Sequence, residues 1–196
     1  VSRGSSTPNT EEENKIVEID YSKGQKIGSD SAKIKLVEFA DLQCPACASA
    51  QSSVKEIVAR NASNPDFQFI YRHYPLPLHK HAKLAANFAE IAGTQGRFFD
   101  AVQWLYETQG QWESLGDPTD YFATKAPDFG LDTQKVKDDL KGQIFSDRIN
   151  DDVREGTVVG VNSTPTFFVN GKKLKFNSIA EIRSGIEAAL EEAKNK

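Results

Sequence analysis

The sequence predicts an α/β protein in which a central mixed β-sheet is flanked by helices and interrupted by an inserted all-helical subdomain. Residues 34–71 have the pattern of strand, helix and strand, and strand patterns return only after residue 160. Between them, from Pro77 to Val159, the apolar spacing is helical throughout. At 196 residues, one domain carrying an insertion is the natural expectation.

The chain divides into four stretches. Residues 15–77 and 160–196 are expected to form the sheet domain, and residues 78–159 the helical subdomain. Residues 1–14 are polar and turn-rich, which indicates a disordered linker or tag remnant. Because the chain contains no methionine, it does not begin at its own initiator, and we expect an N-terminal anchor upstream of it.

The composition limits the kinds of partner. Hydrophobic residues make up 38% of the chain, which is enough for a core. A formal charge of -4 and a pI near 5.5 offer no general attraction to nucleic acid. No apolar run approaches the roughly 20 residues that span a bilayer. We therefore expect neither a nucleic-acid partner nor a membrane-spanning segment within this sequence.

The first part of the chain alternates strands with one helix. Ile34–Asp41 is nearly continuous in apolar residues, as in a strand buried on both faces. The helix after Cys47 ends before Asn64–Pro65, because proline disfavours helical geometry in the residue that precedes it. The remaining elements are expected to be an edge strand over Lys15–Asp20, a loop over Gly24–Ala32 and a strand over Phe67–Tyr71.

The middle of the chain is predicted to be helical. Asp117 is expected to cap one of these helices, with Pro118 at its first position. The helices are predicted over His79–Ala92, Phe98–Glu107, Thr119–Ala126, Asp132–Leu140 and Ile144–Val159.

The C-terminal part returns to sheet and ends in a helix. Asn170-Gly171 indicates a hairpin between strands at Thr166–Val169 and Lys172–Phe176. Ser178 and Glu181 form a capping box that opens the last helix. The buried stripe of that helix is expected to contain Ile179, Ile182, Ile186, Ala189 and Leu190.

The two cysteines of the chain lie three residues apart, in Cys44-Pro45-Ala46-Cys47. They stand where the buried strand ends and a helix begins, and a CxxC at that junction is a redox site far more often than a structural one. Residues three apart in the first helical turn share a face, so the two sulfurs can bond. The unsatisfied N–H groups at the helix start favour a thiolate on Cys44.

Two other roles for the cysteines remain open at this point. A structural disulfide is disfavoured because so short a loop removes little unfolded-chain entropy. A zinc site would need His79 and His81, whose spacing does not match the usual zinc-finger patterns. The three histidines, with His73, are more simply interpreted as solvated surface residues.

Glu38 and Pro165 are the other candidate site residues. Glu38 interrupts the buried strand six residues before Cys44, where burial would raise its pKa and let it exchange protons with Cys47. An exposed glutamate at the end of a strand is the alternative. Pro165 precedes a strand, where proline is tolerated, and an ordinary turn proline is the default interpretation.

Three motifs together resemble the DsbA-like thiol–disulfide oxidoreductases of the thioredoxin superfamily. They are LVEFADLQCPAC at 36–47, YRHYPL at 71–76 and STPTFFVNG at 163–171, and the similarity covers nearly the whole chain. The resemblance implies a thioredoxin fold with a helical insertion. It also implies that Cys44 is the exposed nucleophile and Cys47 the buried resolving cysteine, and that Glu38 is the buried acidic group.

The resemblance also implies a substrate-binding surface and a reaction. Pro165 matches a cis-proline opposite the thiols, Thr164 precedes it, and these two residues with Pro45 and Ala46 would contact an extended substrate peptide. Ala46 departs from the Pro-His pair familiar in DsbA. We therefore expect the pKa of Cys44 to lie below that of a free thiol, but to be less depressed than in a Pro-His enzyme.

The function implied is a disulfide oxidase that acts on reduced secreted proteins outside the cytoplasm, as a monomer and without a cofactor. A quinone-linked membrane protein resembling DsbB or a VKOR homologue would reoxidise it. A reductase or isomerase using the same chemistry is one alternative. A redox-silent peptide-binding module is another.

Overall fold

The sheet is built around a central strand that leads directly to the cysteines. The computed structural model describes residues 15–195, so the predicted linker lies outside the described residues. The strands are β1 (Gln25–Gly28), β2 (Ile34–Ala40), β3 (Phe67–His73), β4 (Thr166–Val169) and β5 (Lys172–Lys173). Their order in the sheet is β1-β3-β2-β4-β5. β2 pairs parallel with β3 and antiparallel with β4, which confirms the predicted mixed sheet.

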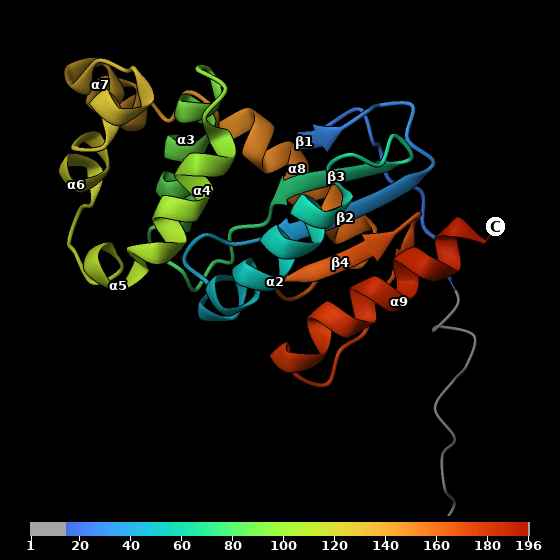
Figure 1. Ribbon diagram of the computed structural model, residues 1–196. Coiled ribbons are helices and arrows are strands. Elements are labelled where there is room, and N and C mark those ends of the chain that lie inside the picture. The colour runs from blue at the N-terminus through green and yellow to red at the C-terminus, as the bar shows by residue number, and fades with distance from the viewer. Residues whose placement is uncertain (1–14, 196) are drawn as a thin grey trace, which may run out of the picture.

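Helices cover both faces of this sheet and gather at one end of it (Figure 1). Helices α2 (Pro45–Asn61) and α9 (Ile182–Lys194) pack on one face, and α8 (Ser146–Val158) packs against β3 from the other. The remaining helices are α3 (Ala82–Gly93), α4 (Phe98–Glu107), α5 (Gln109–Trp112), α6 (Thr119–Ala123) and α7 (Thr133–Gly142), with 3-10 turns at Ala126–Phe129 and Ile179–Glu181. The fold is thus the predicted thioredoxin fold.

The alternation of side chains along β2 places Glu38 on the cysteine side of the sheet. Leu36 and Ala40 belong to the core under α2, whereas Val37 and Phe39 belong to a smaller core on the opposite face. Because successive side chains of a strand point to opposite faces, Glu38 shares the face of Leu36 and Ala40. The carboxyl group is therefore directed into the core that holds the thiols.

The predicted edge strand at residues 15–20 does not form. Ile16 makes only an isolated bridge with Lys172, and the chain turns at Asp20, whose Oδ1 accepts a hydrogen bond from the Ser22 backbone N–H at 3.0 Å. One edge of the sheet is instead β1, in the stretch predicted to be a loop, and the other is β5. β1 is half-buried and lacks a clear period of two, so its pattern gave no strand signal.

The hairpin after residue 165 is confirmed. Asn170 and Gly171 both have positive φ, 47° and 80°, as the tight turn between β4 and β5 requires. β5 ends at Lys173, three residues earlier than predicted.

The predicted capping box is wrong. Ser178 makes no side-chain cap, and the Glu181 carboxylate accepts a hydrogen bond from the Asn177 backbone N–H at 3.0 Å instead. The helix begins one turn later, at Ile182, which leaves Ile179 40% exposed and outside the buried stripe. Local hydrogen bonding by the glutamate thus replaced the reciprocal cap.

The helical region shares its core with the sheet. No strand forms between Pro77 and Val159, as predicted, although α3 and α6 are each three residues shorter at one end than expected. Asp117 accepts a hydrogen bond from the Thr119 backbone N–H, but the helix begins at Thr119 rather than at Pro118. Phe69 of β3 contacts Phe99 of α4, so one apolar cluster runs across both regions. The subdomain limits at 78 and 159 stay a prediction.

Arg72 on β3 is a fully buried cation. Its Nε lies 2.5 Å from Asp152 Oδ1, and its Nη2 lies 2.6 Å from Glu155 Oε2. Replacing Arg72 with methionine leaves the Asp152 carboxylate buried and without its cation, so we expect the free energy of unfolding to fall by about 3–5 kcal/mol. Urea unfolding of the two proteins measures this loss.

Arg60 provides the matched control. It also forms two ion pairs, with Glu56 and Glu187, but its side chain is 58% exposed. Because exposed pairs contribute at most about 1 kcal/mol, the Arg60→Met change should cost much less. Equal losses in the two variants would contradict a special role for the buried cation.

Candidate active site

The two thiols lie at the start of α2. Cys44 is the residue before the helix, with extended backbone angles, and Pro45 occupies the first helical position as predicted. Cys47 follows in the first turn, and the structure holds both as free thiols. Cys44 is 7% exposed and Cys47 is 1% exposed, so Cys44 is less open than its predicted role as an exposed nucleophile implied.

The loop before β4 accounts for this cover over Cys44. The Cys44 thiol donates to the Thr164 carbonyl oxygen at 3.4 Å, and the Thr164–Pro165 peptide bond is cis. The Thr164 hydroxyl is buried and has no hydrogen-bond partner among residues 15–195. Thr164 and Pro165 therefore face the nucleophile, as the resemblance implied.

Several groups stabilise a thiolate on Cys44. A hydrogen bond from the Cys47 thiol is the largest influence. Together with a hydrogen bond from the Thr164 side chain and those from the backbone N–H groups of Ala46 and Cys47, it outweighs the opposing effect of burial. The pKa of Cys44 is lowered from 9.0 to about 5. At neutral pH the sulfur is thus a thiolate, which is the form that attacks disulfides and the better leaving group.

Cys47 and Glu38 are shifted in the opposite direction. Burial raises the pKa of Cys47 well above 9.0, and the neighbouring charges of Cys44 and Glu38 raise it further. Burial also raises the pKa of Glu38 from 4.5 to about 8. Glu38 Oε2 is buried without a hydrogen-bond partner, so the exposed-glutamate alternative is wrong. The protonated carboxyl group of Glu38 and the protonated thiol of Cys47 therefore lie close to each other and to the Cys44 thiolate.

A groove of about 600 Å³ opens beside the thiols. It runs from Ala46 and the loop around Pro165 along β5 to the start of α9, and is lined there by Lys173, Phe176 and Ile179. Ala46 and Pro165 are thus lining residues of one surface. Such a groove beside an attacking sulfur can hold the segment that flanks a reacting cysteine.

Sequence reasoning missed the anchor of the segment that leads into the thiols. The buried Asp41 carboxylate accepts hydrogen bonds from the backbone N–H groups of Gln43 and Leu76, each at 2.7 Å. His79 Nδ1 lies 2.7 Å from the same carboxylate, and Tyr106 donates to the Asp41 carbonyl at 3.3 Å. An acidic residue at the end of an apolar strand was the available signal.

The expectation that the histidines are solvated is wrong. His73 and His81 are 1% and 5% exposed, and His79 is the aspartate-bound residue just described. His73 Nε2 lies 3.0 Å from Glu90 Oε1, and His81 Nε2 lies 2.7 Å from the Leu115 carbonyl. His73 and His81 are buried and His79 is half-buried, and each ring has a long-range polar partner. Within residues 15–195 no group of metal-ligating side chains converges.

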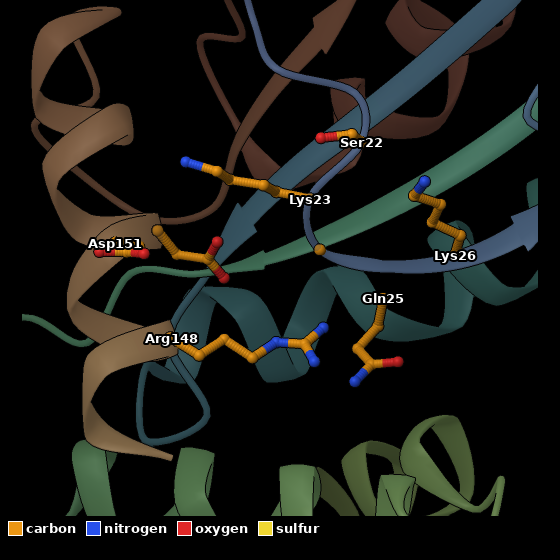
Figure 2. Close-up of a pocket in the computed structure, with 8 residues that line it drawn as sticks. Ser22, Lys23, Gln25, Lys26, Arg148 and Asp151 are labelled. Carbon is orange, nitrogen blue, oxygen red and sulfur yellow. The ribbon is translucent and has the colours of Figure 1, made fainter.

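A second hollow lies away from the thiols, between β1 and α8 (Figure 2). Figure 2 shows Arg148 and Gln25 pointing toward one another across it. Both side chains reach the buried Glu90 carboxylate, at 3.2 Å and 2.8 Å. This hollow contains none of the predicted site residues, and its polar groups hold β1 to α8.

The fold and the paired thiols define the class of protein. The solved structures of BdbD from Bacillus subtilis in its oxidised form (TM-score 0.81, 21% identity, 94% of this chain and 100% of that chain) and of DsbA2 from Pseudomonas aeruginosa (TM-score 0.63, 25% identity, 85% and 91%) are similar to this chain. So is MdbA, a thiol-disulfide oxidoreductase from Corynebacterium diphtheriae (TM-score 0.69, 19% identity, 83% and 85%). The fold is that of the DsbA-like thiol–disulfide oxidoreductases.

The sequence comparison gives the family. A family model described as Thioredoxin matches residues 21–188. The chain therefore belongs to the thioredoxin family.

Curated relatives match this chain over only part of their length. The Na(+)/H(+) antiporter NhaA 1 of Mycobacterium sp. (strain KMS) is 34% identical over 151 residues, which cover 76% of this chain and 24% of that protein. NhaA 1 of Salinispora arenicola is 31% identical over 159 residues, 81% of this chain and 23% of that protein. The chain thus spans about a quarter of the length of these relatives. Among residues 15–195, no helix is both long and apolar enough to cross a membrane.

Proposed function

We propose that this protein is a disulfide oxidase that transfers the Cys44–Cys47 disulfide to reduced polypeptides. The observation that carries the proposal is the opposite shift of the two thiols, with the pKa of Cys44 near 5 and that of Cys47 well above 9.0. A stabilised thiolate on Cys44 favours the reduced form of the pair. A pair whose reduced form is stabilised is a strong oxidant, and DsbA is the familiar example of this relation.

The reaction proceeds through a mixed disulfide. A substrate thiolate attacks Cys44 Sγ, the Cys44–Cys47 bond breaks, and Cys47 leaves and takes a proton from the Glu38 carboxyl group. A second substrate thiolate then attacks the substrate sulfur of the mixed disulfide, and Cys44 leaves as a thiolate. The substrate loses two electrons and two protons. The enzyme gains the two electrons. Both substrate protons pass to water, and water returns one of them to Glu38, so the enzyme's net gain is the one proton held on Cys47.

After each turnover the reduced enzyme must be reoxidised, and the reaction must take place where disulfides persist. We propose that a quinone-linked membrane protein resembling DsbB or a VKOR homologue takes the two electrons back, and that the enzyme works as a monomer on secreted proteins outside the cytoplasm. The absence of any other cysteine supports this location, because no bystander thiol can be trapped in a wrong disulfide. An N-terminal anchor would hold the enzyme at the membrane near its reoxidant.

The test uses the oxidised full chain and reduced, unfolded ribonuclease A. We expect disulfides to form in the substrate at a rate proportional to the enzyme concentration, and the Cys44→Ser variant to show none of this rate. A glutathione redox equilibrium measures the direction: a strongly reducing potential would assign the protein to the reductases instead. Loss of both oxidation and insulin reduction in the intact protein would leave only a redox-silent peptide-binding role.

A further inference from the structure

The groove beside Cys44 is basic although the protein as a whole is acidic. Its lining contains Lys173 and Lys175 and no aspartate or glutamate, whereas the chain carries a formal charge of -4. The nearest carboxylate along the chain, that of Glu181, is held by the Asn177 backbone N–H. A negatively charged segment entering the groove is therefore attracted, and a positively charged one is repelled.

Lys173 is fixed at the wall of this groove. It lies half-buried on β5, and its Nζ donates to the Gly160 carbonyl at 2.6 Å. No carboxylate from residues 15–195 is paired with it. An ammonium group has three donors, so the bond to Gly160 leaves donors for an incoming acceptor.

The surroundings of Lys173 destabilise the charged form of its amine when no substrate lies in the groove. Burial lowers its pKa, and the charge of Lys175 lowers it further. A carboxylate placed beside Nζ offsets both effects, because it stabilises the charged amine in a partly desolvated position. A neutral amide offers no such compensation.

The groove also limits how many residues can separate that carboxylate from the reacting cysteine of the substrate. It begins at Ala46 and at the loop around Thr164, which contacts Cys44, and it continues past the apolar side chains of Phe176 and Ile179. An extended chain advances about 3.3 Å per residue, so the groove holds residues within a few positions of the reacting cysteine. The apolar wall accepts aliphatic parts of the same segment.

We propose that this groove selects reduced polypeptides that carry acidic side chains within a few residues of the reacting cysteine, and that Lys173 is the residue that recognises the carboxylate. The proposal deepens the proposed oxidase function and rests on it. The oxidation step itself is unchanged, with the Cys44–Cys47 disulfide as the oxidant.

The test compares two dithiol peptides that differ only in having glutamate or glutamine around the cysteines. Their oxidation by the oxidised full chain is followed by acid quenching and separation of the products. Each rate is divided by the rate of the same peptide with bis(2-hydroxyethyl) disulfide, which removes the effect of glutamate on the thiol pKa. We expect the glutamate peptide to react about threefold faster, the size of one solvent-accessible ion pair, and the preference to shrink in high salt.

The Lys173→Gln variant should bring this ratio close to one, because glutamine offers the carboxylate no charged partner. Lys172→Gln is the matched control: it removes the same charge one residue away, but its side chain pairs with Glu192 at 3.2 Å and lines a different hollow. Equal rates for both peptides, or equal effects of the two lysine variants, would overturn the selectivity and leave the oxidase intact. Failure to oxidise either peptide would instead overturn the oxidase function.

Discussion

Replacing Cys47 with alanine is expected to raise the pKa of Cys44 from about 5 toward the unperturbed 9.0. The Cys47 thiol is the strongest single influence that lowers the pKa of Cys44. A hydrogen bond to a charged group contributes about 1.5–3 kcal/mol, which corresponds to a change of roughly 1–2 pH units in the midpoint. Thiolate absorbance, or the pH dependence of alkylation by iodoacetamide, measures this midpoint.

The Cys47→Ser variant is the matched control for this change. Serine keeps an O–H donor at nearly the same place, so its Cys44 midpoint should lie between those of the native protein and the alanine variant. Both variants lack the resolving sulfur and should trap mixed disulfides with substrates to the same extent. An alanine variant that still titrates near pH 5 would show that the backbone N–H groups of α2 stabilise the thiolate without help from Cys47.

The second large effect is expected at Glu38, where glutamine should stabilise the protein at alkaline pH. In the folded protein the pKa of Glu38 is about 8, above its ordinary 4.5, so the folded state keeps a proton that the unfolded chain releases. Stability therefore falls as pH rises from 4.5 to 8, by up to about 5 kcal/mol for this group. Glutamine carries no such charge, so the difference between the two proteins should grow across this window and level off above it.

The same Glu38→Gln variant should be a slower oxidase. A positioned acid contributes about 100-fold or more, and glutamine cannot supply a proton to the departing Cys47. After correction for the thiolate fraction of the substrate, the native rate should decline as pH passes about 8, and the variant should show no such decline. A variant that is stabilised at high pH yet keeps its full rate would remove Glu38 from the reaction and leave it a buried carboxyl group only.

Cys44 produces the reverse pH dependence in the reduced protein. Its folded pKa of about 5 lies below the 9.0 of the free thiol, so the stability it contributes is fully present above pH 9 and is lost as pH falls through 5. The oxidised protein has no thiolate and lacks this contribution. As pH rises from 5 to 8, the free energy of unfolding of the reduced form should therefore fall much less than that of the oxidised form. Calorimetry of the two forms can measure this difference.

Most of the active site could be predicted from the sequence because it is local. The strand Ile34–Asp41, the proline at the first helical position and the two cysteines follow one another along the chain, so periodicity and spacing place them together. The period of two along β2 also placed Glu38 on the face of Leu36 and Ala40. Pro165, which lies far along the chain, was matched to the site only through resemblance.

The wrongly predicted parts depend on contacts between distant segments or on local hydrogen bonds that compete with the predicted ones. The histidines are withdrawn from solvent by partners such as Asp41 and Glu90, which no local pattern reveals, and β1 is a strand because β3 offers an open edge. Glu181 binds the Asn177 backbone N–H in place of the predicted cap. In each case long-range or competing hydrogen bonds overrode the local preference.

The apolar cluster that joins α3 and α4 to the sheet bears on how this protein can be altered. Phe98 packs edge-on against Tyr71 of β3, and Phe99 packs against Phe69, so residues that look like an insert in the linear order form part of the sheet's own interior. Excising the segment would expose that interior rather than restore a smaller parent fold. The two parts should therefore melt together in a single cooperative transition, and a change made in either part should alter the stability of both.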